Sequence, residues 1–248
     1  MLLVHGNRAH AGWWGPVAPL LARNYRVAAL SLSGMGGSDW RDTYTSTDHS
    51  AELFSAIAAA GLAESVVRPL IVAHSFGGTV AGNAVRGQGD RVAGVVFVDS
   101  AMTPPAMREG IRSTMRVPRR YPDLASALAR FRLSPTQPSH CPFILDDVAR
   151  GGLVEEDGVW RWRFDPMIMQ KLNTVEAWDV VLDPPCPIAF IYGERSALAS
   201  EPIIAAQRAG APPGTPIFGI AEAWHHVMFD QPIALVAAIR ALAACWQG

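Results

Sequence analysis

Ala73-His74-Ser75-Phe76-Gly77 follows the apolar run 69–72 and precedes a segment of small residues, 78–85, that has helical character. This order predicts a buried strand, a sharp turn and a helix, with Ser75 at the apex of the turn. Such a turn lifts a hydroxyl group above the edge of the sheet, and it needs small residues two positions before and after the serine. We therefore take Ser75 as the candidate nucleophile.

Short apolar runs alternate with helical patterns along most of the remaining chain. Strands are predicted at 2–4, 25–30, 92–98, 188–192 and 216–220, and helices near 13–21, 48–60 and 232–246. Strands that are apolar throughout and separated by helices predict an α/β fold, with a mostly parallel sheet flanked by helices. Ligands bind at the carboxyl ends of the strands in such sheets. One rim should therefore carry His5, Ser75, Asp99, Gly193 and His225.

Residues 101–180 interrupt this alternation. The stretch is rich in proline and arginine, and Met107, Ile111 and Met115 recur in it at helical spacing. We interpret it as a helical cap inserted between the fourth and fifth strands. The expected domains are therefore a core of residues 1–100 and 181–248 and an inserted cap or lid of residues 101–180.

The composition argues against several classes of protein. With 248 residues and a formal net charge of −1, the chain offers no electrostatic attraction for nucleic acid or an anionic membrane. No apolar stretch approaches the ~20 residues of a membrane-spanning helix, so we expect no membrane association and a cytoplasmic location. The odd number and wide spacing of the cysteines argue against a disulfide framework or a metal site. These cysteines are Cys141, Cys186 and Cys245. We expect neither a metal nor another cofactor.

A serine nucleophile needs a base that accepts its proton and an acid that orients the base. His225 and His226 both follow the last predicted strand, and Pro232 starts the final helix seven residues after His225. The residues alone do not distinguish these adjacent histidines. His74 neighbours the serine in sequence, and we expect a packing role for it.

The acid is the least regular feature of the sequence. An aspartate is expected three residues after Gly193, but Ser196 occupies that position. A hydroxyl group cannot stabilise an imidazolium as a carboxylate does. Asp99 ends the buried strand one along from the serine, and a carboxylate there can also reach the base, so we prefer it. Glu194, Glu201 or the absence of a functional acid remain the alternatives.

A developing oxyanion needs preorganised hydrogen-bond donors. Two backbone N–H groups would serve here, that of Phe76 after the nucleophile and that of Asn7 in the loop after the first strand. The substrate is expected to be a small molecule in an apolar pocket between core and cap. Its candidate lining residues are Trp13, Trp14, Trp160 and Trp162.

Together these residues resemble the α/β-hydrolase superfamily, and in particular its cap-bearing serine esterases. The segment 3–7 resembles the family's oxyanion strand and loop, and 31–38 resembles its Asp-x-x-Gly-x-Gly-x-Ser loop with serine in place of the aspartate. The segment 223–226 resembles the family's Gly-His ending, with tryptophan in place of glycine. In the family the catalytic histidine usually lies seven residues before the proline, which selects His225. In some members the acid follows the strand after the nucleophile, which is the position of Asp99.

The resemblance implies hydrolysis of a carboxylic ester, with an apolar ester as substrate, through an acyl-enzyme on Ser75. Alternatives are a C–C hydrolase or a hydroxynitrile-lyase-like enzyme with the same residues, or a non-catalytic protein that binds small ligands.

The chain begins on what resembles the third strand of the family's sheet. Without the first two strands, strand 25–30 is expected to be an uncovered edge that is prone to pairing. An upstream start, a trimmed chain or a homodimer formed through this edge are the alternatives.

Overall fold

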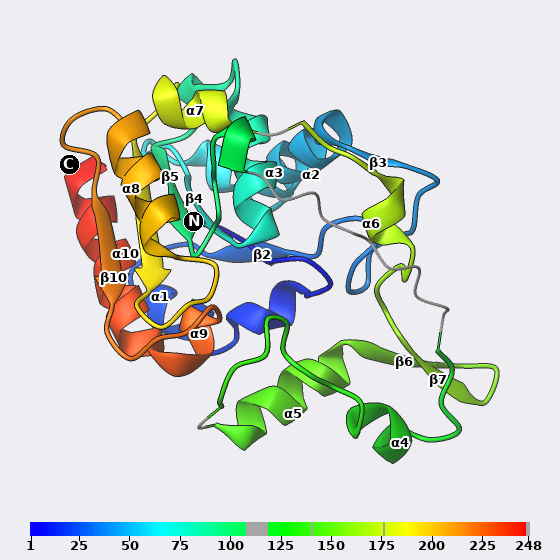
Figure 1. Ribbon diagram of the computed structural model, residues 1–248. Coiled ribbons are helices and arrows are strands. Elements are labelled where there is room, and N and C mark those ends of the chain that lie inside the picture. The colour runs from blue at the N-terminus through cyan, green and yellow to red at the C-terminus, as the bar shows by residue number, and fades with distance from the viewer. Residues whose placement is uncertain (108–118, 140, 176, 247–248) are drawn as a thin grey trace.

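The computed structural model describes residues 1–107, 119–139, 141–175 and 177–246, and a parallel sheet of six strands lies at its centre (Figure 1). The strand order is β10-β9-β5-β4-β1-β2. The strands are β1 (Leu2–Val4), β2 (Ala28–Leu30), β4 (Leu70–His74), β5 (Gly94–Val98), β9 (Ile188–Gly193) and β10 (Ile217–Ile220). The six predicted strands are confirmed, although β2 is shorter than the predicted 25–30.

Alternate residues of each buried strand point to opposite faces of the sheet, and helices pack against the apolar side chains on both faces. In β4, Ile71 and Ala73 belong to one apolar cluster, whereas Leu70 and Val72 belong to the other. The first cluster contains residues of α2 (Ser46–Ala59), α3 (Phe76–Val85) and α7 (Trp178–Leu182). The second contains residues of η1 (Ala11–Trp14), α1 (Ala18–Leu21), α9 (Val227–Asp230) and α10 (Pro232–Trp246).

Local sequence accounts for where several helices begin. At the start of α2, Thr45 Oγ1 accepts a hydrogen bond from the Asp48 N–H at 3.1 Å, while Asp48 Oδ2 accepts one from the Thr45 N–H at 3.3 Å. This reciprocal capping box satisfies two N–H groups that lack partners within the helix. The predicted helix over 13–21 is instead a 3-10 turn followed by the short α1, because Gly15 and Pro16 interrupt it.

The segment 101–180 consists of short elements. They are η4 (Pro105–Met107), α4 (Leu124–Leu128), α5 (Pro142–Gly151), β6 (Leu153–Glu156), β7 (Val159–Trp162), α6 (Ile168–Lys171) and β8 (Leu172–Asn173). In Figure 1, α4, α5 and the β6–β7 pair lie together on one side of the sheet, away from most of the helices that cover its faces. The predicted helical stripe beyond Met107 lies outside the described residues, so the cap boundaries stay a prediction.

A two-stranded hairpin is the element of this segment that departs most from a helical cap. β6 and β7 pair antiparallel, and the residues between them, Asp157 and Gly158, have φ of 53° and 73°. Positive φ at both central residues is what a tight two-residue hairpin turn requires. A second small pairing joins β8 to β3 (Tyr44–Thr45), so this segment also contacts the loop before α2.

The remaining elements complete the core. They are α8 (Glu201–Gly210), η2 (Leu62–Glu64) and η3 (Gly89–Arg91). β2 pairs with β1 alone among the described strands and therefore lies at the edge of the sheet. None of the helices in the described residues is both long enough and apolar enough to cross a bilayer.

Candidate active site

Ser75 sits on a strained turn between β4 and α3. Its φ of 53° and ψ of −122° lie in a region that side-chain-bearing residues seldom adopt, at a cost of about 1–3 kcal/mol. Two hydrogen bonds to its backbone hold the turn, from the Ser75 N–H to Val98 O and from Ser100 Oγ to Ser75 O, each 3.0 Å long. A Cβ atom at Gly77 would lie 2.6 Å from the His5 carbonyl oxygen, so this position requires glycine. The turn predicted from the sequence is therefore present.

Asp99 lies directly after β5 and contacts His225. The Asp99 Oδ2 atom accepts a hydrogen bond from His225 Nδ1 at 2.6 Å, and its side chain has no exposed surface. The Gly193 N–H donates to Oδ1 at 2.9 Å, and the Ser196 hydroxyl donates to Oδ2 at 2.6 Å. Three donors thus surround one buried carboxylate and fix its orientation toward His225.

The other candidate acids do not contact His225. Glu194 and Glu201 are exposed, and neither forms a hydrogen bond or ion pair with His225 in the described chain. Ser196, which occupies the position where an aspartate was expected, instead donates to the carboxylate of Asp99. The Ser196 position therefore still contributes to the candidate site, as a hydrogen-bond donor to Asp99.

His225 follows β10, is 3% exposed and lines the same cavity as Ser75. Because its Nδ1 is bonded to a carboxylate, this nitrogen carries the proton and Nε2 carries the lone pair. A neutral imidazole in this tautomer can accept a proton from a hydroxyl group in the cavity. The adjacent His226 makes no hydrogen bond to Asp99, which distinguishes the two histidines that the sequence left open.

Asn7 and Phe76 bring two backbone N–H groups to this region. Asn7 follows β1, and Phe76 is the first residue of α3, where the helix dipole favours negative charge. Within the described residues neither N–H donates to another protein atom. The Asn7 side chain bonds elsewhere, with Nδ2 donating to Met169 Sδ at 3.0 Å. Asn7 lines the cavity, whereas Phe76 is not among its lining residues, and the oxyanion role of the two amides stays a prediction.

His5 supports the loop that carries Asn7. Its Nε2 accepts a hydrogen bond from the Leu32 N–H at 3.0 Å, and its Nδ1 bonds Gly6 O at 2.7 Å. Burial lowers the pKa of His5 to about 4, because charging the ring inside the protein is costly. His5 is therefore neutral near pH 7 and ties β1 to the loop after β2.

The cavity at this site has a volume of about 410 Å³. Trp13 and Trp162 line it, but Trp14 and Trp160 do not: Trp14 is fully buried, and Trp160 pairs with Tyr121 across a β-bridge. The sequence did not indicate the charged part of this lining. It consists of Arg8, Arg130, Arg132 and Arg163.

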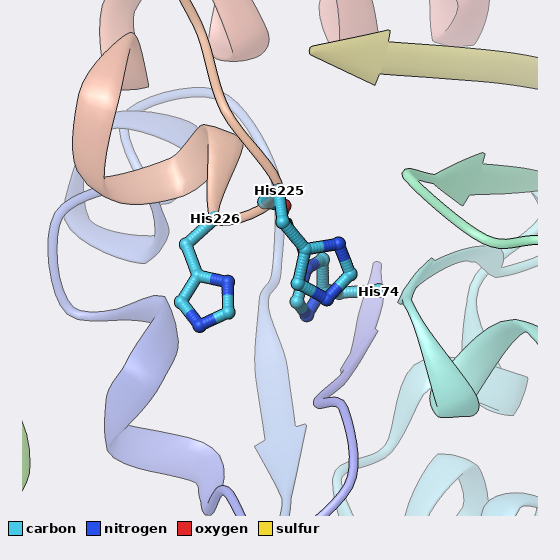
Figure 2. Close-up of side chains that lie close together, drawn as sticks. All are labelled: His74, His225 and His226. Carbon is cyan, nitrogen blue, oxygen red and sulfur yellow. Dashed lines mark hydrogen bonds between the residues drawn. The ribbon is translucent and has the colours of Figure 1, made fainter. Parts of the chain in front are cut away.

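Two further histidines lie beside His225 in a position that the sequence did not reveal (Figure 2). The ring centroids of His74 and His226 are 4.6 Å and 4.8 Å from that of His225. Burial lowers the pKa of His226 to about 3, and burial together with His225 and His226 holds the pKa of His74 well below its usual range. Both rings are therefore neutral near pH 7. His74 packs as expected, but it also lines the cavity.

The sequence model of the alpha/beta hydrolase family matches residues 1–239 of this chain. Polyneuridine aldehyde esterase of Rauvolfia serpentina is 32% identical over 107 residues, which are 42% of this chain and 39% of that protein. Esterase PIR7B of Oryza sativa subsp. japonica is 36% identical over 105 residues, 41% of this chain and 38% of that protein. The matches thus span about two fifths of these curated relatives.

Two solved structures have a similar fold. The thioesterase domain from the curacin biosynthetic pathway has a TM-score of 0.78 and 21% identity, covering 96% of this chain and 90% of that one. An esterase of Mycobacterium tuberculosis has a TM-score of 0.76 and 23% identity, covering 98% of this chain and 83% of that one. At these identities the similarity concerns the fold alone.

Proposed function

Because the chain belongs to the alpha/beta hydrolase family, we propose that it is a serine hydrolase that cleaves carboxylic esters through an acyl-enzyme on Ser75. The observation that carries this proposal is the 2.6 Å bond between His225 Nδ1 and Asp99 Oδ2, on a cavity that Ser75 also lines. The esterase names of the two curated relatives favour ester substrates.

The first half of the proposed reaction acylates the serine. Ser75 Oγ attacks the ester carbonyl carbon while His225 Nε2 accepts the hydroxyl proton. Asp99 stabilises the imidazolium that forms. The tetrahedral intermediate then collapses, the bond to the alcohol oxygen breaks, and His225 returns the proton to the departing alcohol.

The second half repeats these steps with water. His225 takes a proton from water, the hydroxide attacks the acyl carbon, and the carboxylic acid leaves as Ser75 regains its proton. In both halves the N–H groups of Asn7 and Phe76 would bind the negatively charged oxygen. Each such donor typically contributes about 10²–10³ in kcat.

The cavity lining suggests both an apolar and an anionic part of the substrate. The aromatic rings of Trp13, Phe131, Trp162 and Phe164 favour an apolar acyl or alcohol group. Among the described lining residues there are four arginines and no carboxylate. Arg130, Arg132 and Arg163 form no ion pair with a described acidic residue. We therefore propose an ester that also carries an acidic group.

A fluorophosphonate probe tests the proposed nucleophile, because it reacts only with an activated serine. We expect it to label the wild-type protein and not Ser75→Ala, and we expect this variant to lose about 10⁴–10⁶-fold in kcat on p-nitrophenyl butyrate. Ser55→Ala, at an exposed serine of α2, is the matched control. A folded wild-type protein that binds small ligands but is neither labelled nor active would instead be a non-catalytic binding protein.

A further inference from the structure

Three imidazole rings meet at the wall of the cavity (Figure 2). His74 ends β4, whereas His225 and His226 lie in the loop between β10 and α9. One ring nitrogen from each histidine lies within 4.8 Å of the other two. All three residues are at most 3% exposed, and each of them lines the cavity. The proposed acid–base chemistry uses only one of these rings.

The hydrogen bonds of His74 and His225 fix which nitrogen of each ring carries a lone pair. His74 Nε2 lies 3.0 Å from His225 O, and a carbonyl oxygen only accepts, so Nε2 carries the proton. The lone pair of His74 is therefore on Nδ1, which is buried and has no hydrogen-bond partner. By the same reasoning, the bond to Asp99 leaves the lone pair of His225 on Nε2.

His226 supplies a third lone pair. Its ring is 1% exposed and packs against Trp13 and Phe229, with centroids 5.2 Å and 5.7 Å away. Neither of its ring nitrogens has a hydrogen-bond partner among the described residues. A neutral imidazole has one bare nitrogen in either tautomer. Leaving buried polar atoms without partners is costly, so the cluster favours a ligand that accepts electron pairs.

We propose that His74, His225 and His226 form a binding site for one divalent transition cation of borderline softness, such as Zn²⁺, and that this cation inhibits the enzyme. Imidazole nitrogen suits such cations, whereas Mg²⁺ and Ca²⁺ prefer oxygen ligands. A tetrahedral zinc ion with Zn–N bonds of about 2.0–2.1 Å holds its nitrogens about 3.3 Å apart. The ring nitrogens, which lie within 4.8 Å of one another, therefore have to move closer together to bind the ion.

Neighbouring groups already orient two of the three ligands. Asp99 bonds the distal nitrogen of His225, and the His225 carbonyl oxygen bonds the distal nitrogen of His74. Carboxylates and carbonyls in this position fix the tautomer of metal-bound histidines and raise their basicity. A water molecule or the Ser75 hydroxyl can complete the coordination from the cavity.

Inhibition is expected because the metal would bind the same nitrogen lone pair that the proposed reaction needs. A cation on His225 Nε2 takes the electron pair with which this ring would accept the proton of Ser75. This half of the inference rests on the proposed function, whereas binding of the cation does not. Binding and activity are therefore measured separately.

Binding is measured by isothermal titration of the metal-free protein with Zn²⁺ and by the visible absorption of Co²⁺. We expect one ion per chain and the intense bands of four-coordinate Co²⁺. His226→Phe keeps an aromatic ring beside Trp13 and Phe229, and we expect it to raise the Kd by about 10–100-fold or more. His49→Gln is the matched control, because both nitrogens of this buried histidine also lack partners, yet it is not part of the cluster.

Three outcomes of the binding measurement would overturn the site. They are the pale spectrum of hydrated Co²⁺, a His226→Phe protein that binds as tightly as wild type, and an equal loss of affinity in His49→Gln. Circular dichroism of each variant without metal shows whether it has folded. If His226→Phe does not fold, His226→Asn replaces it.

Inhibition is measured as the loss of fluorophosphonate labelling and of p-nitrophenyl butyrate hydrolysis when Zn²⁺ is added. We expect both to disappear in parallel with binding and to return after the metal is removed with a chelator. Hydrolysis that continues with the site saturated would overturn the inhibition. If the protein is not labelled but still binds Zn²⁺ through His226, the proposed hydrolase function is contradicted and the proposed metal site is supported.

Discussion

The two walls of the cavity are built differently. The wall at the ends of β1, β4 and β10 is mostly buried, and behind it the Asp99 carboxylate accepts three hydrogen bonds. The wall from segment 101–180 is made of short elements, and its arginines, Arg130, Arg132 and Arg163, are exposed or half-buried. A rigid wall suits bond-making chemistry, and an open one suits selection among substrates. Changes in the first wall should therefore reduce kcat, and changes in the second should alter substrate preference.

After the loss of the nucleophile itself, the largest effect is expected from Asp99→Asn. An amide at this position cannot stabilise the imidazolium and favours the wrong tautomer of His225, so kcat should fall by about 10⁴-fold. Glu194→Gln is the control and should stay near the wild-type rate. The measurement is turnover of p-nitrophenyl acetate and butyrate. A near wild-type kcat in Asp99→Asn would show that the rigid wall does not contain the acid.

A smaller loss is expected from Ser196→Ala, which removes a hydroxyl donor 2.6 Å from the Asp99 carboxylate. Hydrogen bonds to charged groups contribute about 1.5–3 kcal/mol, so kcat should fall about tenfold or more. Ser200→Ala is the matched control, because this exposed serine makes no side-chain capping bond to α8. Equal rates in the two variants would mean that Ser196 does not help to hold the acid.

The neutral ring of His5 makes the rigid wall sensitive to acid. Its pKa is about 4 in the folded protein and about 6.5 in the unfolded chain, so between these values the unfolded state binds more protons. Stability from this group is complete above about pH 6.5 and is lost as the pH falls toward 4. From His5 alone the free energy of unfolding should fall by about 2 kcal/mol between pH 7 and pH 5, and His74 and His226, whose pKa values burial also lowers, add to this loss.

Urea unfolding at the two pH values measures this loss, and His5→Gln should reduce the pH dependence. An unchanged pH dependence in that variant would assign the acid sensitivity to other groups.

The smallest effect is expected in the open wall, from Arg130→Gln. Removing one exposed charge should weaken kcat/KM for the hemiester mono-p-nitrophenyl succinate by about three- to tenfold, while uncharged p-nitrophenyl butyrate is little affected. Arg240→Gln, at an exposed arginine of α10 outside the cavity lining, is the control. Added salt should weaken the preference. Equal changes in kcat/KM for the two esters would contradict the proposal that the substrate carries an acidic group.

The same contrast explains how much of the fold could be predicted from sequence. Each strand of the sheet is a short apolar run, so β5 and β9 were predicted within two residues of their observed bounds. Short elements in segment 101–180 depend on tertiary contacts, which local patterns do not encode. One available signal was missed there, because Asp157-Gly158 between two alternating segments is typical of a hairpin turn.

The candidate site divides in a similar way. Ser75 and Asp99 could be proposed because each directly follows a predicted strand, and parallel strands end at one rim. The hydrogen bond from Ser196 to Asp99 and the approach of His74 to His226 depend on how loops pack. The arginines of the cavity come from three separate loops, after β1, after α4 and after β7, and no single spacing in the sequence joins them.

The contact between Ser196 and Asp99 also constrains which residues these two positions can hold together. Two carboxylates at these positions would lie within hydrogen-bond distance, and like charges so close cannot both stay ionised. The two loops are thus alternative locations for a single negative charge. A second aspartate at position 196 would have to share a proton with Asp99, whereas the hydroxyl of Ser196 donates a hydrogen bond and adds no charge.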